Sequence, residues 1–141
     1  MLENIKFFVL CLIVILFFSC NKERRINRNL QGRWEVDKVK LQDVDGFSFF
    51  DNNPKGKLLI SDKTVQGEIT SSFQTFLGSV SDTLALYGSY YLNLDNAELN
   101  WLQSPDTIKN RIFVITNKNL EIECYNAISQ QRMRYVFKKI R

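Results

Sequence analysis

The chain of 141 residues contains no histidine and only three cysteines. Histidine is the side chain that proteins use most often as a general base and as a metal ligand. Its absence also excludes serine–histidine and cysteine–histidine dyads. We therefore expect a protein without enzymatic activity, without a cofactor and without a bound metal.

The three cysteines are too few for a disulfide framework or a thiolate metal cluster. Cys11 lies inside an apolar N-terminal run, and Cys20 closes that run. Only Cys124 remains in the rest of the chain, so no internal disulfide forms there even in an oxidising compartment. Cys124 alternates with Leu120 and Ile122, which indicates a small buried hydrophobe rather than a reactive thiol.

The longest apolar run lies at the start of the sequence. Its core, from Phe7 to Phe18, has the length of a signal-peptide core and is too short to span a bilayer. Lys6 and the amino terminus make the start weakly positive. We predict a signal peptide over residues 1–19, followed by a polar, charged tether over residues 20–30.

The end of this run, Phe17-Phe18-Ser19-Cys20, resembles the lipobox of bacterial lipoproteins. The resemblance implies cleavage before Cys20 and acylation of this cysteine, with palmitate-type chains holding the protein to the membrane. Several chains make a durable anchor, because each buried CH₂ contributes about 0.8 kcal/mol and a single chain binds only marginally. An ordinary signal peptide cut nearby, or an uncleaved anchor, is the alternative.

The lipobox resemblance also implies a location in the cell envelope. Asn21 is not the aspartate that retains lipoproteins in the inner membrane of some bacteria, so we expect the outer membrane of a Gram-negative bacterium. The net charge is +4, with bases concentrated at Lys22 to Arg28 and Lys138 to Arg141. A basic segment beside a lipid anchor favours anionic membrane headgroups over nucleic acid as its partner.

Residues 31–141 show apolar residues recurring with period two in short runs, which predicts β-strands. Trp34 and Val36 occupy one phase of the first strand and Val39 and Leu41 the other, which indicates a bulge or a bend. The eight expected strands are residues 32–41, 57–61, 64–72, 84–94, 97–102, 108–116, 120–125 and 131–139. Residues 43–54 are expected to form a loop, and residues 73–83 fit either a helix or an irregular apolar loop.

Eight strands joined mostly by short turns predict an antiparallel meander. With no long helix to cover it, such a sheet protects its edges by closing on itself or by forming two layers. We favour the all-β, up-and-down, eight-stranded barrel. A barrel of this size is either filled by side chains or holds one small ligand.

The segment Gly32-Arg33-Trp34 resembles the Gly-x-Trp pattern that opens the first strand of lipocalins. The wider stretch from Leu30 to Val36 is similar to the start of small lipocalin-like domains on bacterial envelope lipoproteins. The resemblance implies that Gly32 and Trp34 close one end of the barrel. It also implies that an arginine of the last strand, Arg132 or Arg134, packs over the tryptophan ring.

Four aromatic residues are candidates for lining a ligand cavity, because such cavities are mostly apolar and aromatic. They are Tyr91, Trp101, Tyr135 and Phe137; plain core packing is the alternative. The paired carboxylates Glu121 and Glu123 share the outward face of their strand, which predicts a solvated surface rather than a hydrolytic site.

The sequence therefore predicts a membrane-anchored lipoprotein that binds a small apolar or amphipathic ligand in its barrel. The alternative is a non-enzymatic protein-binding module of the envelope with a filled barrel, such as a hydrolase inhibitor or an accessory subunit. The strand segment Ile112 to Ile115 is apolar on both faces, so it is the candidate surface for such a partner.

Overall fold

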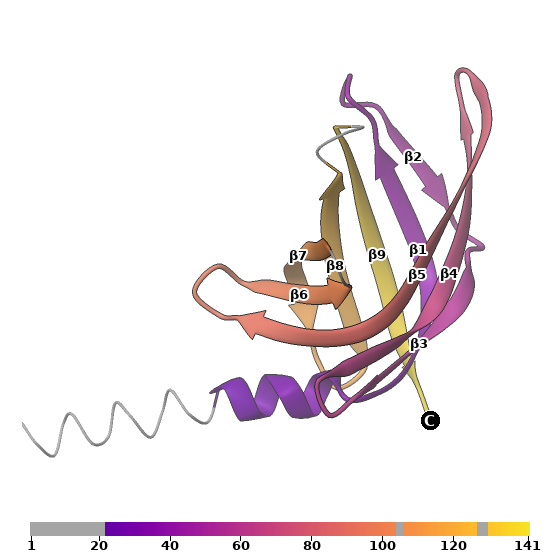
Figure 1. Cartoon of the computed structure of the whole chain (residues 1–141). Helices are drawn as coiled ribbons and strands as arrows, with labels where there is room; N and C mark the ends of the chain where they lie inside the picture. The colour runs from indigo at the N-terminus through magenta and orange to yellow at the C-terminus, as the bar shows by residue number, and fades with distance from the viewer. Residues whose placement is uncertain (1–21, 104–105, 127–129) are drawn as a thin grey trace, which may run out of the picture.

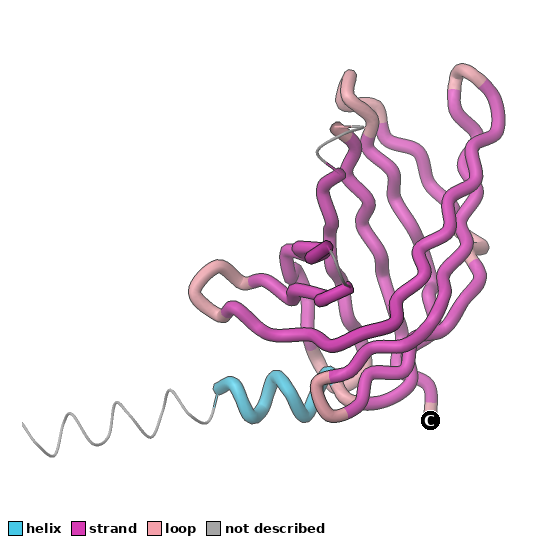
Figure 2. Tube along the Cα trace, viewed as in Figure 1, coloured by secondary structure: helices cyan, strands magenta, loops and turns pink. Residues whose placement is uncertain are grey.

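The computed structural model describes residues 22–103, 106–126 and 130–141. These residues form nine strands and one helical segment at residues 22–30 (Figures 1 and 2). The strands are β1 (Gly32–Gln42), β2 (Ser48–Asp51), β3 (Lys55–Ser61), β4 (Thr64–Thr75), β5 (Gly78–Asn93), β6 (Glu98–Gln103), β7 (Asp106–Ile115), β8 (Asn119–Asn126) and β9 (Gln131–Ile140). Within the described residues, no helix is both long and apolar enough to cross a membrane.

The strands form a closed antiparallel barrel, which confirms the predicted fold class. Neighbours pair in the order β2-β1-β3-β4-β5-β6-β7-β8-β9, and β1 also pairs with β9. The first half of β1 pairs with β3 and its second half with β2. The barrel therefore consists of the eight strands β1 and β3–β9, with β2 as a short flap that replaces β3 at one end.

The phase change in β1, for which we expected a bulge or a bend, is a bulge. The register between β1 and β9 shifts between Val36 and Lys38, so Asp37 is the extra residue. Trp34 and Val36 before the shift, and Val39 and Leu41 after it, are all buried. The bulge thus brings two out-of-phase pairs to the same inner face.

The barrel interior holds one continuous apolar core. At the end where β1 begins, Trp34 lies opposite Leu58, and Ile60 lies opposite Val65. From the other side of the barrel, Phe137 of β9 joins this layer. Each buried side chain of this size contributes about 1.5–3 kcal/mol relative to an exposed one, so this layer anchors the fold.

The segment before β1, which we expected to be a polar tether, contains a helix that the sequence analysis did not predict. Residues 22–30 are helical, Leu30 is fully buried, and Ile26 packs against the core. Figure 1 shows the helix at the end of the barrel where the C-terminus also lies. The apolar spacing of Ile26 and Leu30, four residues apart, is the signal that was missed, because it places both on one helical face.

Residues 73–83 form neither a helix nor an irregular loop, so both expectations were wrong. β4 and β5 continue through this stretch as a hairpin whose turn contains Phe76 and Leu77. The hydroxyl of Thr75 donates to the Gly78 carbonyl at 2.8 Å, which closes the turn. These two exposed apolar residues interrupt the alternation of apolar and polar residues and give the stretch an apolar spacing like that of a helix. The expected loop at residues 43–54 likewise contains β2.

Candidate functional site

Trp34 lies at the end of the barrel nearest the helix. Its ring is fully buried, and its Nε1 donates to the carbonyl oxygen of Leu30 at 2.7 Å. Gly32 has a φ of +131°, and a Cβ there would lie 2.9 Å from Cε of Lys139. The positive φ is the reason that glycine is favoured here, because the end of the Lys139 side chain can shift away from an added Cβ.

The cation over Trp34 is Lys139, and the expectation of Arg132 or Arg134 was wrong. The Lys139 Nζ lies 4.9 Å from the Trp34 ring centroid and donates to the Asn29 carbonyl at 2.7 Å. This carbonyl belongs to the last turn of the helix, where a cation is favourable. Burial lowers the pKa of Lys139.

The phase of β9 explains why the arginines are elsewhere. Lys139 shares the inward phase of Tyr135 and Phe137, whereas Arg132 and Arg134 share the opposite phase. The two arginines lie on the outer face, with Arg132 over the Tyr125 ring at 5.9 Å and Arg134 over the Phe113 ring at 3.9 Å.

Three of the four aromatic candidates for a ligand cavity belong to the packed core. Trp101, Tyr135 and Phe137 are each at most 2% exposed, and the rings of the last two stack at 6.1 Å. Tyr91 was predicted wrongly: it is 44% exposed, while its neighbour Tyr90 faces inward and is buried. A run of two tyrosines hides the strand phase, because either one fits the inner face.

An apolar groove lies at the other end of the barrel, and we call it the mouth groove. Its volume is about 350 Å³. Its apolar lining is Leu41, Phe47, Phe49, Phe76, Leu77 and Val80, and its polar lining is Asp43, Asp45, Thr75 and Gln131. Sequence reasoning missed it because most of its residues come from two segments for which we had not expected strands, residues 43–54 and 73–83.

The mouth groove is held in shape by aromatic contacts between the β1–β2 connection and the β4–β5 turn. The ring of Phe76 meets Phe47 edge to face at 5.1 Å between centroids and Phe49 at 5.5 Å. The Ser72 amide also donates to the Asp51 carboxylate at 2.7 Å, which ties β2 to β4. The two walls are therefore linked by packing and by a hydrogen bond.

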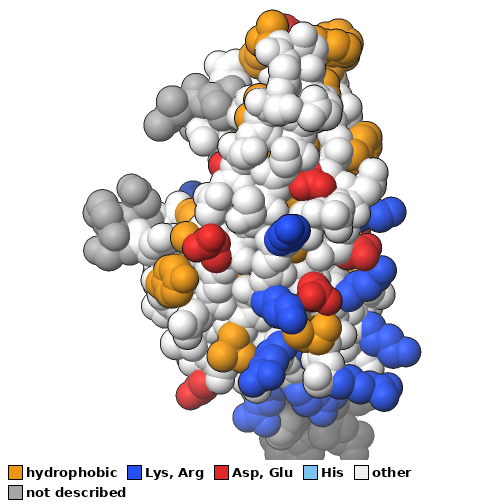
Figure 3. Space-filling model, turned by 90° about the vertical axis from the view of Figure 1, so that its right-hand side faces the viewer, with side chains coloured by type: hydrophobic (Ala, Val, Ile, Leu, Met, Phe, Trp, Pro, Cys, Tyr) orange, Lys and Arg blue, Asp and Glu red, His pale blue; other side chains and the backbone are white. Residues whose placement is uncertain are grey.

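On one face of the molecule, basic side chains and the largest group of apolar side chains lie toward opposite ends. Figure 3 shows apolar side chains at the end that carries the β4–β5 turn, and lysine and arginine side chains toward the end that carries the helix. Phe76 is 77% exposed and Leu77 is completely exposed. The mouth groove thus opens away from the basic end of the barrel.

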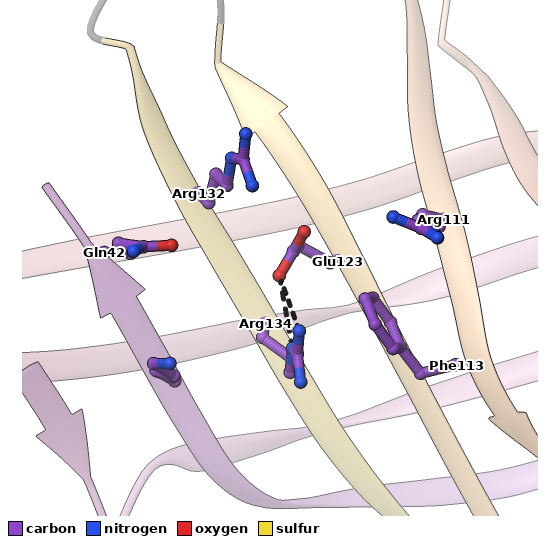
Figure 4. A pocket seen from close by; sticks show the side chains of 7 residues that line it. Gln42, Arg111, Phe113, Glu123, Arg132 and Arg134 are labelled. Atoms are coloured by element: carbon purple, nitrogen blue, oxygen red, sulfur yellow. Dashed lines mark hydrogen bonds and ion pairs between the residues drawn. The ribbon is translucent and has the colours of Figure 1, made fainter. Parts of the chain in front are cut away.

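A second hollow, which we call the basic groove, crosses the outer face of β1, β9, β8 and β7 (Figure 4). Its volume is about 190 Å³. The lining residues are Lys40, Gln42, Arg111, Phe113, Glu123, Arg132 and Arg134. The outward face predicted for Glu121 and Glu123 is correct, but both carboxylates pair with Arg134, at 3.3 and 3.0 Å.

Cys124 lies on the inner face opposite Met133. Burial, reinforced by the carboxylate of Asp82, raises its pKa from 9.0 to about 11. At neutral pH such a thiol carries roughly a hundredfold less thiolate than one with the ordinary pKa, and the thiolate is the nucleophilic form. Its surroundings therefore oppose nucleophilic chemistry.

Comparison with known proteins assigns no family to the chain. No protein-family model matches it, and no curated protein matches it. Among solved structures, a de novo designed fluorescence-activating β-barrel is 14% identical, with a TM-score of 0.43, over 82% of this chain and 98% of the other. A redesigned barrel, mFAP1, bound to DFHBI is 15% identical, with a TM-score of 0.41, over 82% and 99% of the two chains. The strand pairing of this chain itself shows the barrel.

Proposed function

We propose that this protein is a lipid-anchored envelope lipoprotein whose barrel binds a small apolar or amphipathic molecule at the mouth groove. The mouth groove itself is the observation that carries the proposal. Its volume of about 350 Å³ falls within the range of roughly 300–1,000 Å³ typical of small-molecule sites. Its lining of aromatic and aliphatic side chains with a few polar groups has the usual composition of such sites.

The proposed binding place is the rim of the barrel and not its interior, where the sequence had suggested a cavity. Trp101, Tyr135 and Phe137 occupy the interior that the sequence had offered as a cavity. At the rim, Phe76 and Leu77 expose apolar surface that a ligand would remove from water, which is favourable in proportion to its area. Asp43 and Asp45 border this surface, so an amphipathic molecule could place a polar group beside them.

Substitution of Phe76 by serine tests this site. The side chain contacts both other phenylalanines of the groove, so its loss removes one wall and is expected to weaken binding of the uncharged probe Nile red about tenfold. The measurement is a fluorescence titration of the chain beginning at residue 22, which leaves out the apolar N-terminal run. Phe50→Ser is the matched control, because Phe50 is similarly exposed but does not line the groove.

Equal Nile red affinity in the wild type and the Phe76→Ser variant would argue against a ligand site at the mouth. That result would favour the second candidate function, an envelope protein-binding module. The protruding turn with its fully exposed Leu77 supports this second candidate, as do Phe113 and Val114, which are 40% and 36% exposed on the barrel's outer face.

The anchor proposal is tested at Cys20, which lies outside the described residues. In the Cys20→Ala variant we expect an unprocessed precursor and loss of labelling by an alkyne analogue of palmitate, because the acylated thiol is gone. Cys11→Ala is the matched control, and its labelling should equal that of the wild type. Undiminished acyl labelling of the Cys20→Ala variant would exclude this anchor.

A further inference from the structure

The basic groove has no role in the function proposed above. It shares no lining residue with the mouth groove and lies on the outer face of the barrel rather than at its rim. Four of its seven lining residues are lysine or arginine, and one is glutamate. It is therefore a site of surplus positive charge built on three adjacent strand pairs.

Arg134 is the fixed part of this groove. Its Nε and Nη2 donate to one oxygen of Glu123 at 3.2 and 3.0 Å, and its Nη1 donates to Glu121 at 3.3 Å. The same guanidinium lies 3.9 Å from the centroid of the Phe113 ring. These contacts hold Arg134 in one position and satisfy most of its N–H donors. Arg134 therefore shapes the groove, and few of its donors remain for a ligand.

Arg111 and Arg132 are held in place without being neutralised. Arg111 lies 5.3 Å from the Phe113 ring centroid, and Arg132 lies 5.9 Å from that of Tyr125. Lys40 lies 5.8 Å from the Phe50 ring centroid in the same way. Within the described part of the chain, none of these three cations has a carboxylate within ion-pair distance.

We propose that the basic groove binds a phosphate group, either inorganic phosphate or a phosphate monoester. Guanidinium groups present paired N–H donors that match phosphate oxygens, and Arg111 and Arg132 line one small hollow together with Lys40. Aromatic rings against the arginine side chains limit their motion, so less conformational entropy is lost on binding.

The charge and size of the groove favour a compact dianion such as phosphate over a carboxylate. Arg134 is paired with Glu121 and Glu123. Among the described residues this leaves Lys40, Arg111 and Arg132 as unpaired cations of the lining, and a dianion compensates them better than a single carboxylate does. The volume of about 190 Å³ is below the range of sites that enclose a whole drug-sized molecule. The groove thus fits one charged group whose organic part, if it has one, extends into solvent.

The test is isothermal titration calorimetry of the full chain, held in an uncharged detergent, with inorganic phosphate at constant ionic strength. We expect saturable binding, at least tenfold weaker affinity for Arg132→Gln, and a further tenfold loss when Arg111→Gln is added. Arg33→Gln is the matched control, because it removes the same positive charge from β1 and Arg33 does not line the groove. Thermal unfolding of each variant checks that the barrel is intact. If an arginine variant does not fold, Lys40→Gln is measured in its place.

Competition identifies the source of the phosphate group. Displacement by dissolved glycerol 3-phosphate points to a soluble monoester, and displacement by phosphatidic acid mixed into the micelles points to a lipid headgroup. Either result supports the site. The inference is overturned if phosphate shows no saturable binding, or if the Arg111→Gln/Arg132→Gln variant binds it as tightly as the Arg33→Gln control. Neither outcome affects Nile red binding at the mouth groove, so the two proposals fail separately.

Discussion

Replacement of Trp34 by alanine is expected to lower the free energy of unfolding by about 3–5 kcal/mol, the usual cost of removing a large buried aromatic side chain. The ring is fully buried among residues of β1, β3 and β9, and its loss leaves a cavity at the closed end of the barrel. It also leaves the Lys139 ammonium without its aromatic partner. Urea unfolding followed by far-ultraviolet circular dichroism measures the change.

Two further variants separate the parts of this effect. Trp34→Phe keeps an apolar ring but removes the donor to the Leu30 carbonyl, so we expect a loss of about 1–3 kcal/mol. Tyr91→Ala removes an aromatic ring from the outer face, where it is 44% exposed, and should cost less than about 1 kcal/mol. A Trp34→Ala variant no less stable than Tyr91→Ala would show that Trp34 does not close the barrel.

Replacement of Gly56 by alanine is expected to destabilise the barrel by roughly 3–4 kcal/mol. Gly56 has a φ of +138°, and a Cβ there would lie 2.1 Å from the Glu68 carbonyl oxygen and 2.7 Å from Cα of Ile69. Both atoms are backbone of β4, which cannot move away without breaking the β3–β4 ladder. Backbone strain of about 1–3 kcal/mol and steric overlap of similar size therefore add.

Gly78→Ala is the matched control for this substitution. Gly78 also has a positive φ, +120°, but a Cβ there would have no atom within 4 Å. Only the strain of the backbone conformation remains, so we expect a cost of about 1–2 kcal/mol. Denaturant unfolding of both variants should place Gly56→Ala clearly below Gly78→Ala. Equal stabilities would mean that strand β4 yields to the added methyl group.

The barrel was predictable because its strands alternate cleanly between inner and outer positions. The phase change between Trp34 and Leu41 indicated an irregularity in the first strand, and the register of the structure places it at Asp37. The prediction of strand phase and of turns failed where the alternation of apolar and polar residues is hidden. The tandem tyrosines at 90 and 91 obscured which one faces inward, and the exposed pair Phe76 and Leu77 disguised a hairpin turn.

The candidate sites were less predictable than the fold, because each joins residues that are distant in sequence. The mouth groove brings Phe47 and Phe49 against Phe76, and the basic groove brings Lys40 of β1 to the same hollow as Arg111 of β7. Only strand register decides such neighbours, and a sequence pattern does not supply register across the barrel. The lysine over Trp34 could have been predicted from the sequence, since Lys139 continues the inward phase of Tyr135 and Phe137.

Ligand binding at the mouth is tested most directly by native mass spectrometry of the full chain purified from the membrane fraction of a lipoprotein-processing bacterium. Wild type, Phe76→Ser and Phe50→Ser should be measured side by side. We expect an acylated chain with a small-molecule adduct in the wild type and in Phe50→Ser, and a strongly reduced adduct in Phe76→Ser. An adduct-free wild type, or an adduct of equal occupancy in Phe76→Ser, would contradict a ligand site at the mouth of the barrel.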